Sequence, residues 1–444
     1  MVVSQSHKHM LQIPFLTELD SRAAVKGSRD PLGIQQIWTR LGRNVVGNLT
    51  TVSNSVRDFT TLLVGYYFTE QLSKELGVGS ELSVFLKWEQ LAAYSRAHVN
   101  GDYSFRGTEK VRKSLSDGSR VVLSDDRAHQ ILGNQKIYGL WGLYTMPSRA
   151  SGLVDDDPPR LTPSAIEFVE KNYMPLLEKS CGRDAKRIRE LLMQRQSKID
   201  VDRGHADVIA GVAKLLQRKL STHEKEFYRY HLLLGGPENS TAGKQARLAE
   251  LLSTTLDDKS FTWSLATVMA LSQAAQNRDD AWKPLARDLY RIKTSEAVLA
   301  PVSALFTYIL GLDGKPISSL ADRISNEWQG GLQTVVPDDF RELRNDLGVT
   351  DSMTADRWIA VADALHGGDY KTLVHRLVEQ NTHVMASRGG SPWVELDSGK
   401  LRIRFRDEHG SLPKRDSISS LWRFPYFLDS MRIMADTLKE KQSG

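Results

Sequence analysis

The chain has 444 residues, 40% of them hydrophobic and 8% aromatic, which is enough apolar material for ordinary buried cores in two or three domains. Its 59 Lys and Arg against 54 Asp and Glu give a net charge of +5, which permits an anionic partner but argues against a dedicated DNA-coating protein. The one cysteine, Cys181, excludes an intramolecular disulfide framework and favours a reducing compartment.

Two features of the sequence favour the cytoplasm and no membrane. The N-terminal residues lack the basic start and continuous apolar core of a secretory signal. The longest apolar run, residues 297–312, is shorter than the roughly 20 residues of a membrane-spanning helix and contains Pro301. We therefore expect a cytoplasmic protein without a membrane partner, and a buried core helix over this run.

Residues 1–80 are expected to form an N-terminal helical segment. Apolar residues at helical spacing predict a helix over residues 34–41, and a longer one that follows a cap at Thr50 or Thr51 and continues to Leu72. The aromatic residues on these helices are typical of a core rather than of a base-stacking platform.

A short basic helix is predicted at residues 108–115. Five cations lie within 15 residues here: Arg106, Lys110, Arg112, Lys113 and Arg120. Such a cluster is typical of a solvated surface, and it also fits contact with nucleic-acid phosphates.

The stretch that follows contains the most recognisable pattern in the chain. Residues 131–144 are nearly all-round apolar at helical spacing, which predicts a largely buried helix that ends at Pro147. Residues 151–162 predict a short hairpin with the acidic tip Asp155–Asp157. The Thr-Pro pair at 162–163 is typical of the start of a further helix.

A helix, a short hairpin and another helix in this order resemble the C-terminal half of a winged-helix domain, and the resemblance covers residues 82–175. In DNA-binding members of that family, the helix before the hairpin presents polar and basic side chains to the major groove. The corresponding side chains here are Gln135, Lys136 and Arg149, whereas the acidic tip opposes phosphate. The resemblance therefore implies either a DNA-binding module or a module for protein contacts.

A second basic run lies between residues 183 and 198, on a predicted amphipathic helix. Arg187 and Arg195 are its candidate phosphate contacts. The alternative is a solvated face whose long basic side chains cover a core helix. We expect a helical domain over residues 181–314, with a boundary near the turn-forming segment at 311–316, which contains two glycines and a proline.

The C-terminal part changes character after Pro392, where alternating residues predict a β-hairpin over residues 392–406 inside a helical domain at 315–444. Arg402, Arg404 and Arg406 lie on one face of the second strand, about 7 Å apart, which fits a phosphate backbone. Alternatively, the acidic neighbours Glu395, Asp407 and Glu408 neutralise them within the protein.

The sequence contains no recognisable catalytic or metal-binding motif. His223 and Glu224 begin like a zinc-protease helix, but Phe227 stands where the second histidine is needed. We expect no cofactor and no metal, and we consider an enzyme the less favoured possibility.

The sequence predicts a mainly α-helical, multi-domain protein with a winged-helix-like module at 81–180 and a small C-terminal β-hairpin. The favoured function is a non-catalytic nucleic-acid-binding subunit, for DNA in the first instance, of a larger bacterial-type assembly; a role in antiviral genome defence is a hypothesis without a motif. The alternatives are a protein-interaction scaffold with a structural winged helix, and a nuclease or other enzyme with an unrecognised site.

Overall fold

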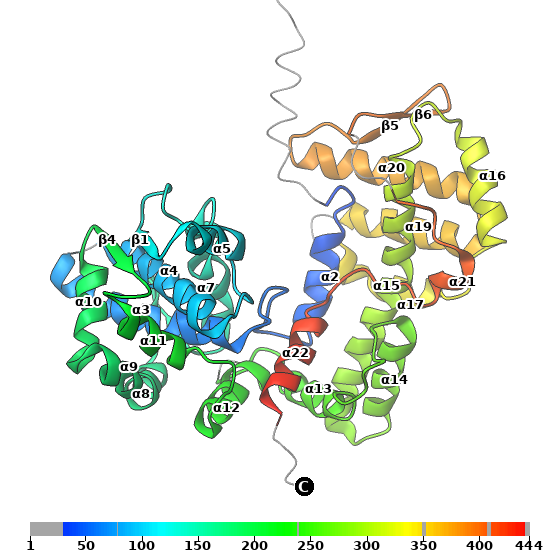
Figure 1. Cartoon of the computed structure of the whole chain (residues 1–444). Coiled ribbons are helices and arrows are strands. Elements are labelled where there is room, and N and C mark those ends of the chain that lie inside the picture. Colours follow the sequence, from blue (N-terminus) through cyan, green and yellow to red (C-terminus); the bar gives the residue numbers. More distant parts are fainter. Residues whose placement is uncertain (1–29, 78, 238, 349–351, 406–409, 440–444) are drawn as a thin grey trace, which may run out of the picture. The chain divides into compact units, whose positions relative to one another are not determined.

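The structure, a computed structural model, describes residues 30–77, 79–237, 239–348, 352–405 and 410–439 (Figure 1). The chain forms two compact units. Unit 1 comprises residues 1–41, 262–273 and 286–424, and unit 2 comprises residues 42–261, 274–285 and 425–444. Both units are mainly helical, as predicted, with short two-stranded antiparallel sheets. Each unit combines segments that are distant in the sequence, whereas the four expected domains, 1–80, 81–180, 181–314 and 315–444, are continuous stretches.

Unit 2 contains most of the N-terminal half of the chain. Its elements are α3 (Val56–Leu76), α4 (Glu81–Asn100), α5 (Thr108–Asp117), β1 (Arg120–Ser124), α6 (Gln135–Tyr138), α7 (Leu140–Ala150), β2 (Val154–Asp155), β3 (Arg160–Leu161), α8 (Pro163–Asn172), α9 (Met174–Cys181), η2 (Arg183–Ala185), α10 (Lys186–Met193), β4 (Gln196–Asp200), α11 (Ala206–Leu215), α12 (Thr222–Tyr228), η3 (Arg229–Leu233), α13 (Lys244–Ser253), η4 (Asp280–Trp282) and α22 (Leu428–Leu438).

The core of unit 2 is the pair of helices α3 and α4, which pack against each other and are covered by α7, α8, α10 and α11. Gly65 lets the two helices approach closely, since a Cβ atom there would lie 2.7 Å from Trp88 and 2.8 Å from Phe85. The indole of Trp88 also donates to Thr61 O at 2.7 Å. Because residues 56–66 of α3 and 84–97 of α4 are buried on every side, the charged residues within these stretches are buried with them.

The segment from residue 131 to 144 is not the single helix expected from its apolar spacing. It is interrupted at Gly139, which separates α6 from α7 and has an extended backbone conformation. A Cβ atom at Gly139 would lie 2.8 Å from both carboxylate oxygens of Glu89, so this position requires glycine. The expected end of the helix at Pro147 is also wrong, because α7 continues through this proline to Ala150.

The expected short hairpin is present as β2 and β3, with Val154 opposite Leu161 and Asp155 opposite Arg160. Helix α8 begins at Pro163, as predicted. Strand β1 pairs with β4, which lies outside the stretch that resembles a winged helix. The winged-helix assignment of residues 82–175 stays a prediction.

Unit 1 contains most of the C-terminal half. Its elements, three of which continue by a few residues into the segments of unit 2, are α2 (Ile34–Arg43), α14 (Leu265–Gln276), α15 (Lys283–Ile309), α16 (Ile317–Trp328), α17 (Pro337–Arg341), α18 (Arg344–Leu347), α19 (Ser352–Gly367), α20 (Tyr370–Ser387), β5 (Val394–Asp397), β6 (Lys400–Ile403) and α21 (Arg415–Ile418).

The predicted C-terminal hairpin is confirmed as β5 and β6, which pair in antiparallel register. Val394 on β5, and Leu401 and Ile403 on β6, are the buried apolar residues of this hairpin. The side chain of Asn381 on α20 accepts hydrogen bonds from the backbone N–H groups of Trp393 and Val394, so α20 holds the first strand in place.

The apolar run at 297–312 is confirmed as a buried helix for most of its length, within α15. Across the residues that the structure describes, none of the helices combines the length and the apolar character that crossing a membrane requires.

Candidate functional site

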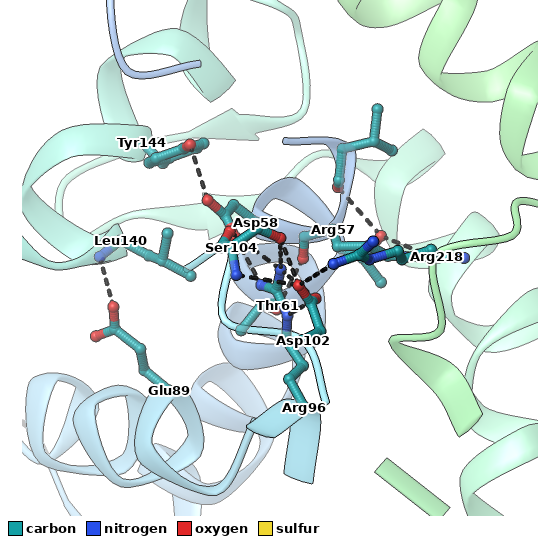
Figure 2. Close-up of polar contacts among 12 residues, drawn as sticks. Arg57, Asp58, Thr61, Glu89, Arg96, Asp102, Ser104, Leu140, Tyr144 and Arg218 are labelled. Atoms are coloured by element: carbon teal, nitrogen blue, oxygen red, sulfur yellow. Dashed lines mark hydrogen bonds and ion pairs between the residues drawn. The ribbon is translucent and has the colours of Figure 1, made fainter. Parts of the chain in front are cut away.

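The least expected feature of unit 2 is a set of charged side chains inside its core. Arg57 and Asp58 on α3, and Glu89 and Arg96 on α4, are each at most 5% exposed (Figure 2). Buried charges are costly unless each is paired and hydrogen-bonded. The contacts of these residues therefore indicate what the cluster does.

Arg96 is the centre of the cluster, because it holds two carboxylates at once. Its Nη1 lies 2.8 Å from Asp58 Oδ1, and its Nε donates to Asp102 Oδ2 at 2.9 Å (Figure 2). Asp102 is 1% exposed, and its other oxygen accepts hydrogen bonds from the backbone N–H of Ser104 at 3.0 Å and from the Ser104 hydroxyl at 2.6 Å. This arrangement fixes the loop after α4 onto the end of that helix.

The two carboxylates have opposite pKa shifts. Burial alone raises the pKa of Asp102, but the hydrogen bonds from Ser104 and the charge of Arg96 lower it to about 2, so Asp102 is ionised. For Asp58, burial is the largest effect and raises the pKa, against the opposing charge of Arg96.

Tyr144 contacts the second carboxyl oxygen of Asp58. Its Oη lies 2.5 Å from Val52 O and 3.0 Å from Asp58 Oδ2. The single proton of the phenol is either shared between these two acceptors, or Asp58 carries a proton and donates to Tyr144 Oη, a form that burial of the carboxyl favours.

Arg57 is neutralised on the other side of α3. It forms an ion pair with Glu224 and donates to Gln217 O at 2.7 Å and to Lys219 O at 2.9 Å. The hydroxyl of Tyr173 donates to the same carboxylate at 3.2 Å. Arg57 therefore joins the start of α3 to the segment between α11 and α12.

Glu89 lies at the break between α6 and α7. One carboxylate oxygen accepts a hydrogen bond from the Leu140 N–H at 2.8 Å (Figure 2). The other accepts from the Gln135 side chain, also at 2.8 Å. Burial raises the pKa of Glu89 to about 7, although these two hydrogen bonds oppose the shift. A small cavity of about 20 Å³ separates this carboxyl from Asp58, Arg96 and Arg106.

The cluster opens into a pocket of about 520 Å³, which we call the arginine pocket. Its lining includes the guanidinium-bearing residues Arg57, Arg96, Arg106 and Arg218, the carboxylates Asp58 and Asp102, and the rings of Tyr103, Phe105 and Tyr144. The buried members form its inner wall. The side chain of Arg218 is 77% exposed and lies at its mouth.

Two of these four arginines have few or no partners. Arg106 forms no hydrogen bond or ion pair with any residue in the described part of the chain, although its charge lowers the pKa of Asp58 and of Glu89. Arg218 has a single long contact, 3.4 Å from its Nη2 to Asp102 Oδ1. Counting Glu224, which neutralises Arg57 from outside the lining, four guanidinium groups face three carboxyl groups. The cationic groups therefore exceed the anionic ones by one when Asp58 is ionised and by two when it is protonated.

Comparisons with protein-family models, curated proteins and solved structures found no match. The function must therefore be argued from the geometry. Nowhere in the described ranges do three or more His, Cys, Asp or Glu side chains come together in a way that could hold a metal ion.

The first group of predicted binding residues has one member in the lining of the arginine pocket and one that stacks on a ring of that lining. The Arg106 side chain lines it, and the exposed Arg112 stacks on Tyr103, with 4.5 Å between the guanidinium carbon and the ring centroid. Lys113 is exposed on the same helix, α5. Lys110 is exposed too, but its ammonium donates to Gln130 O.

The residues expected on the winged-helix recognition helix have diverse environments. Gln135 is fully buried, and its amide bonds to Glu89 and to the backbone of α4, so it is not accessible to a base. Lys136 is exposed on α6. Arg149 is half-buried and donates to Asp156 O at the tip of the β2–β3 hairpin.

The remaining predicted contacts lie elsewhere. In unit 2, Arg187 forms an ion pair with Asp207, and Arg195 is exposed just before β4.

In the hairpin of unit 1, Arg404 lies 2.7 Å from Glu395 and Arg402 lies 4.0 Å from Asp397. Arg406, with Asp407 and Glu408, lies outside the described residues. Both described hairpin arginines thus have a carboxylate beside them on β5.

The buried charges were not predicted, because α3 and α4 were assigned to the core on apolar spacing alone. One signal was present: Arg57, Asp58, Glu89 and Arg96 lie within the apolar stretches of α3 and α4. A charge in such a helix needs a partner inside the protein. The identity of the partners, Asp102 and Glu224, depends on contacts that the sequence does not contain.

Proposed function

We propose that this chain binds nucleic acid, DNA in the first instance, through the basic surface of unit 2 around the arginine pocket, and that it does so as a subunit of a larger cytoplasmic assembly. The observation that carries the proposal is the pair of incompletely neutralised cations Arg106 and Arg218 at one pocket. Guanidinium groups bind phosphate oxygens in a bidentate way, and phosphate contacts supply most of the affinity of such proteins.

Helix α5 extends this surface. Arg112 is held over Tyr103, a ring that also lines the pocket, and Lys113 follows it in the chain. Together with Arg106 and Arg218, these residues offer up to four phosphate contacts. Four contacts predict a slope of roughly −3 to −4 for the logarithm of the binding constant against the logarithm of the salt concentration.

The C-terminal hairpin is a weaker candidate for phosphate contact. Arg402 and Arg404 face the carboxylates of Asp397 and Glu395, so a phosphate would have to compete with groups already in place. This favours internal neutralisation for the hairpin, one of the two interpretations that the sequence left open.

The experiment is a fluorescence-anisotropy titration of the full chain with short single-stranded and double-stranded DNA, at about 50 and 200 mM salt. We expect the double variant Arg106→Ala/Arg218→Ala to weaken binding at least about tenfold and to reduce the salt slope by about two. The double variant Arg402→Ala/Arg404→Ala is the matched control, because it removes the same charge from another exposed surface.

Absence of binding at 50 mM salt would contradict the proposal, and so would an equal loss in both double variants. The titration is repeated with magnesium. Cleavage of the DNA under that condition would contradict the non-catalytic part of the proposal and favour an enzyme with an unrecognised site.

A protein-interaction scaffold is the second candidate, and one observation favours it. Ile137, Tyr138 and Met146 on α6 and α7 are 52%, 58% and 65% exposed, which is unusual for large apolar side chains on one short segment. If the chain binds no DNA, we expect cross-linking from this segment to a protein partner. The variant Ile137→Ser/Met146→Ser should then abolish the cross-link without unfolding the chain, since both side chains are already in water.

A further inference from the structure

The inner wall of the arginine pocket lies too deep for a nucleic-acid duplex to reach. Arg57, Asp58 and Arg96 all line it and are at most 5% exposed, whereas Arg218 at its mouth is 77% exposed on its side chain. Its volume of about 520 Å³ lies within the range of small-molecule sites, about 300 to 1,000 Å³. A pocket of this size admits one small group at a time.

The charges near the pocket favour an anion with more than one negative charge. Arg96 is neutralised by Asp102, whose carboxyl is ionised, and Arg57 is neutralised by Glu224. Arg106 and Arg218 remain against Asp58, whose pKa is raised by burial, so the surplus is two positive charges when Asp58 is protonated. Both arginines lie near the same centre, because Arg106 acts electrostatically on Asp58 and Arg218 lies 3.4 Å from Asp102.

A phosphate monoester matches this surplus better than a backbone phosphate does. It carries nearly two negative charges at neutral pH, whereas each diester within a strand carries one. Monoesters occur at the ends of nucleic-acid strands and in free nucleotides.

The pocket also offers aromatic surface beside these cations. Tyr103 and Phe105 are half-buried, lie on the loop between α4 and α5, and have ring centroids 6.4 Å apart with an angle of 24° between the ring planes. Arg112 and Arg96 each lie over one of the rings, which restrains the ring positions. Bases stack on such rings whatever their identity, because every base has a π face.

We propose that the arginine pocket binds a nucleoside phosphate monoester, with its phosphate on Arg106 and Arg218 and its base on Tyr103 or Phe105. The ligand is either the unstacked terminal nucleotide of a strand or a free nucleotide, which share this chemistry. The strand-end form rests on the proposed nucleic-acid binding, and it adds that the protein recognises a phosphorylated end.

The test compares ligands that differ only in this group. Single-stranded oligonucleotides of one sequence, with a 5′-phosphate, with a 3′-phosphate or with hydroxyls at both ends, are titrated into the full chain by fluorescence anisotropy. Adenosine 5′-monophosphate and inorganic phosphate are titrated separately by calorimetry. Preference for a phosphorylated oligonucleotide indicates the strand end as the source, and tight binding of adenosine monophosphate without such a preference indicates the free nucleotide.

The expected result is a preference of about tenfold or more for the phosphorylated ligand over its hydroxyl form, the size of one or two charge-assisted hydrogen bonds. We expect Arg218→Ala to remove this preference and Arg183→Ala to keep it. Arg183 is a suitable control, because it is 95% exposed, belongs to the same unit and has only a 3.8 Å contact to Asp184. Tyr103→Leu should weaken the binding of adenosine monophosphate more than the binding of inorganic phosphate.

Four outcomes separate this inference from the proposed function. If the protein binds phosphorylated and hydroxyl-ended DNA with equal affinity and does not bind adenosine monophosphate, the inference is overturned and the proposed function remains in place. Binding of adenosine monophosphate without any DNA binding would overturn the proposed function and support the pocket as a nucleotide site. Equal effects of Arg218→Ala and Arg183→Ala would overturn the assignment to this pocket, and no binding of any ligand would overturn both.

Discussion

Glu89 should make the stability of the protein fall as the pH rises through neutrality, and Glu89→Gln should remove this effect. Burial raises the pKa of Glu89 from 4.5 to about 7 in the folded chain. Between these two pH values the folded protein keeps a proton that the unfolded chain releases. A state that binds more protons is favoured at lower pH, so the contribution of Glu89 is fully present below pH 4.5 and is lost as the pH rises to about 7.

The size of the effect follows from the same two values. The difference is about 2.5 pKa units, and each unit corresponds to about 1.36 kcal/mol, so Glu89 accounts for about 3 kcal/mol between pH 4.5 and 8. This is a large part of the stability of a typical domain. Burial lowers the pKa of His205 and His231, which titrate in part of the same range with the opposite sign. The difference between wild type and Glu89→Gln cancels their contribution.

The assay is urea unfolding followed by circular dichroism at pH 5, 6, 7 and 8. Replacing the carboxyl by an amide adds a constant penalty, because the amide cannot accept from both Leu140 and Gln135. The prediction concerns the pH dependence alone: the advantage of wild type over Glu89→Gln should shrink by about 2.5 kcal/mol from pH 5 to 8. Curves that run parallel over this range would refute the reasoning. Glu167→Gln, which changes an exposed carboxylate on α8, should run parallel to wild type.

Three further predictions concern single positions. Gly139→Ala should destabilise the protein by about 1–3 kcal/mol in urea unfolding, because the added Cβ atom would lie 2.8 Å from the Glu89 carboxylate. Gly133→Ala is the control. A Cβ atom at Gly133 has no neighbouring atom within 4 Å, so this substitution should change the stability by less than about 0.5 kcal/mol. Ser221→Ala should cost about 1 kcal/mol in the same assay, because it removes the capping box at the start of α12, and an unchanged urea midpoint would contradict this role. The pKa of Asp102 is lowered from 3.8 to about 2, so this carboxylate should contribute about 2 kcal/mol to the free energy of unfolding, and this contribution is lost as the pH falls through that interval. The destabilisation caused by Asp102→Asn should therefore decrease from pH 5 to 2.5. A destabilisation that stays constant over this range would contradict the pKa shift.

Local patterns in the sequence predicted local structure well. The hairpin of β5 and β6 follows from alternating residues and from the turn at Ser398 and Gly399, both of which have a positive φ angle. The start of α8 follows from its Thr-Pro signal. In each case the information lies within a few neighbouring residues.

Predictions that depended on distant contacts were wrong or absent. The helix expected over residues 131–144 is broken at Gly139 because Glu89, some 50 residues earlier, captures the N–H of Leu140. The strand pair β1 and β4 was not foreseen, since Arg120 pairs with Asp200 across a long intervening segment.

The candidate site was predictable in part. The cations of the loop before α5 and of α5 itself were identified from their density. Of these, Arg106 lines the arginine pocket, and Arg112 stacks on Tyr103, a ring of its lining. Arg218 was not identified, because a single arginine in a loop carries no pattern. Its relation to Asp102 arises only when the segment between α11 and α12 folds back onto the end of α4.

The position of α22 in the chain has a consequence for how the protein is made. This helix belongs to unit 2, packs against α13 and η3, and contributes Ile433 and Thr437 to the lining of the arginine pocket. It emerges from the ribosome only after the roughly 160 residues that separate it from residue 261, which takes about 8 to 30 seconds at the usual rate of about 5 to 20 residues per second. During that interval the nascent chain exposes the apolar surface that α22 later covers, so chaperones have a defined period in which to bind it, and ligand binding at the pocket has to wait for the last helix.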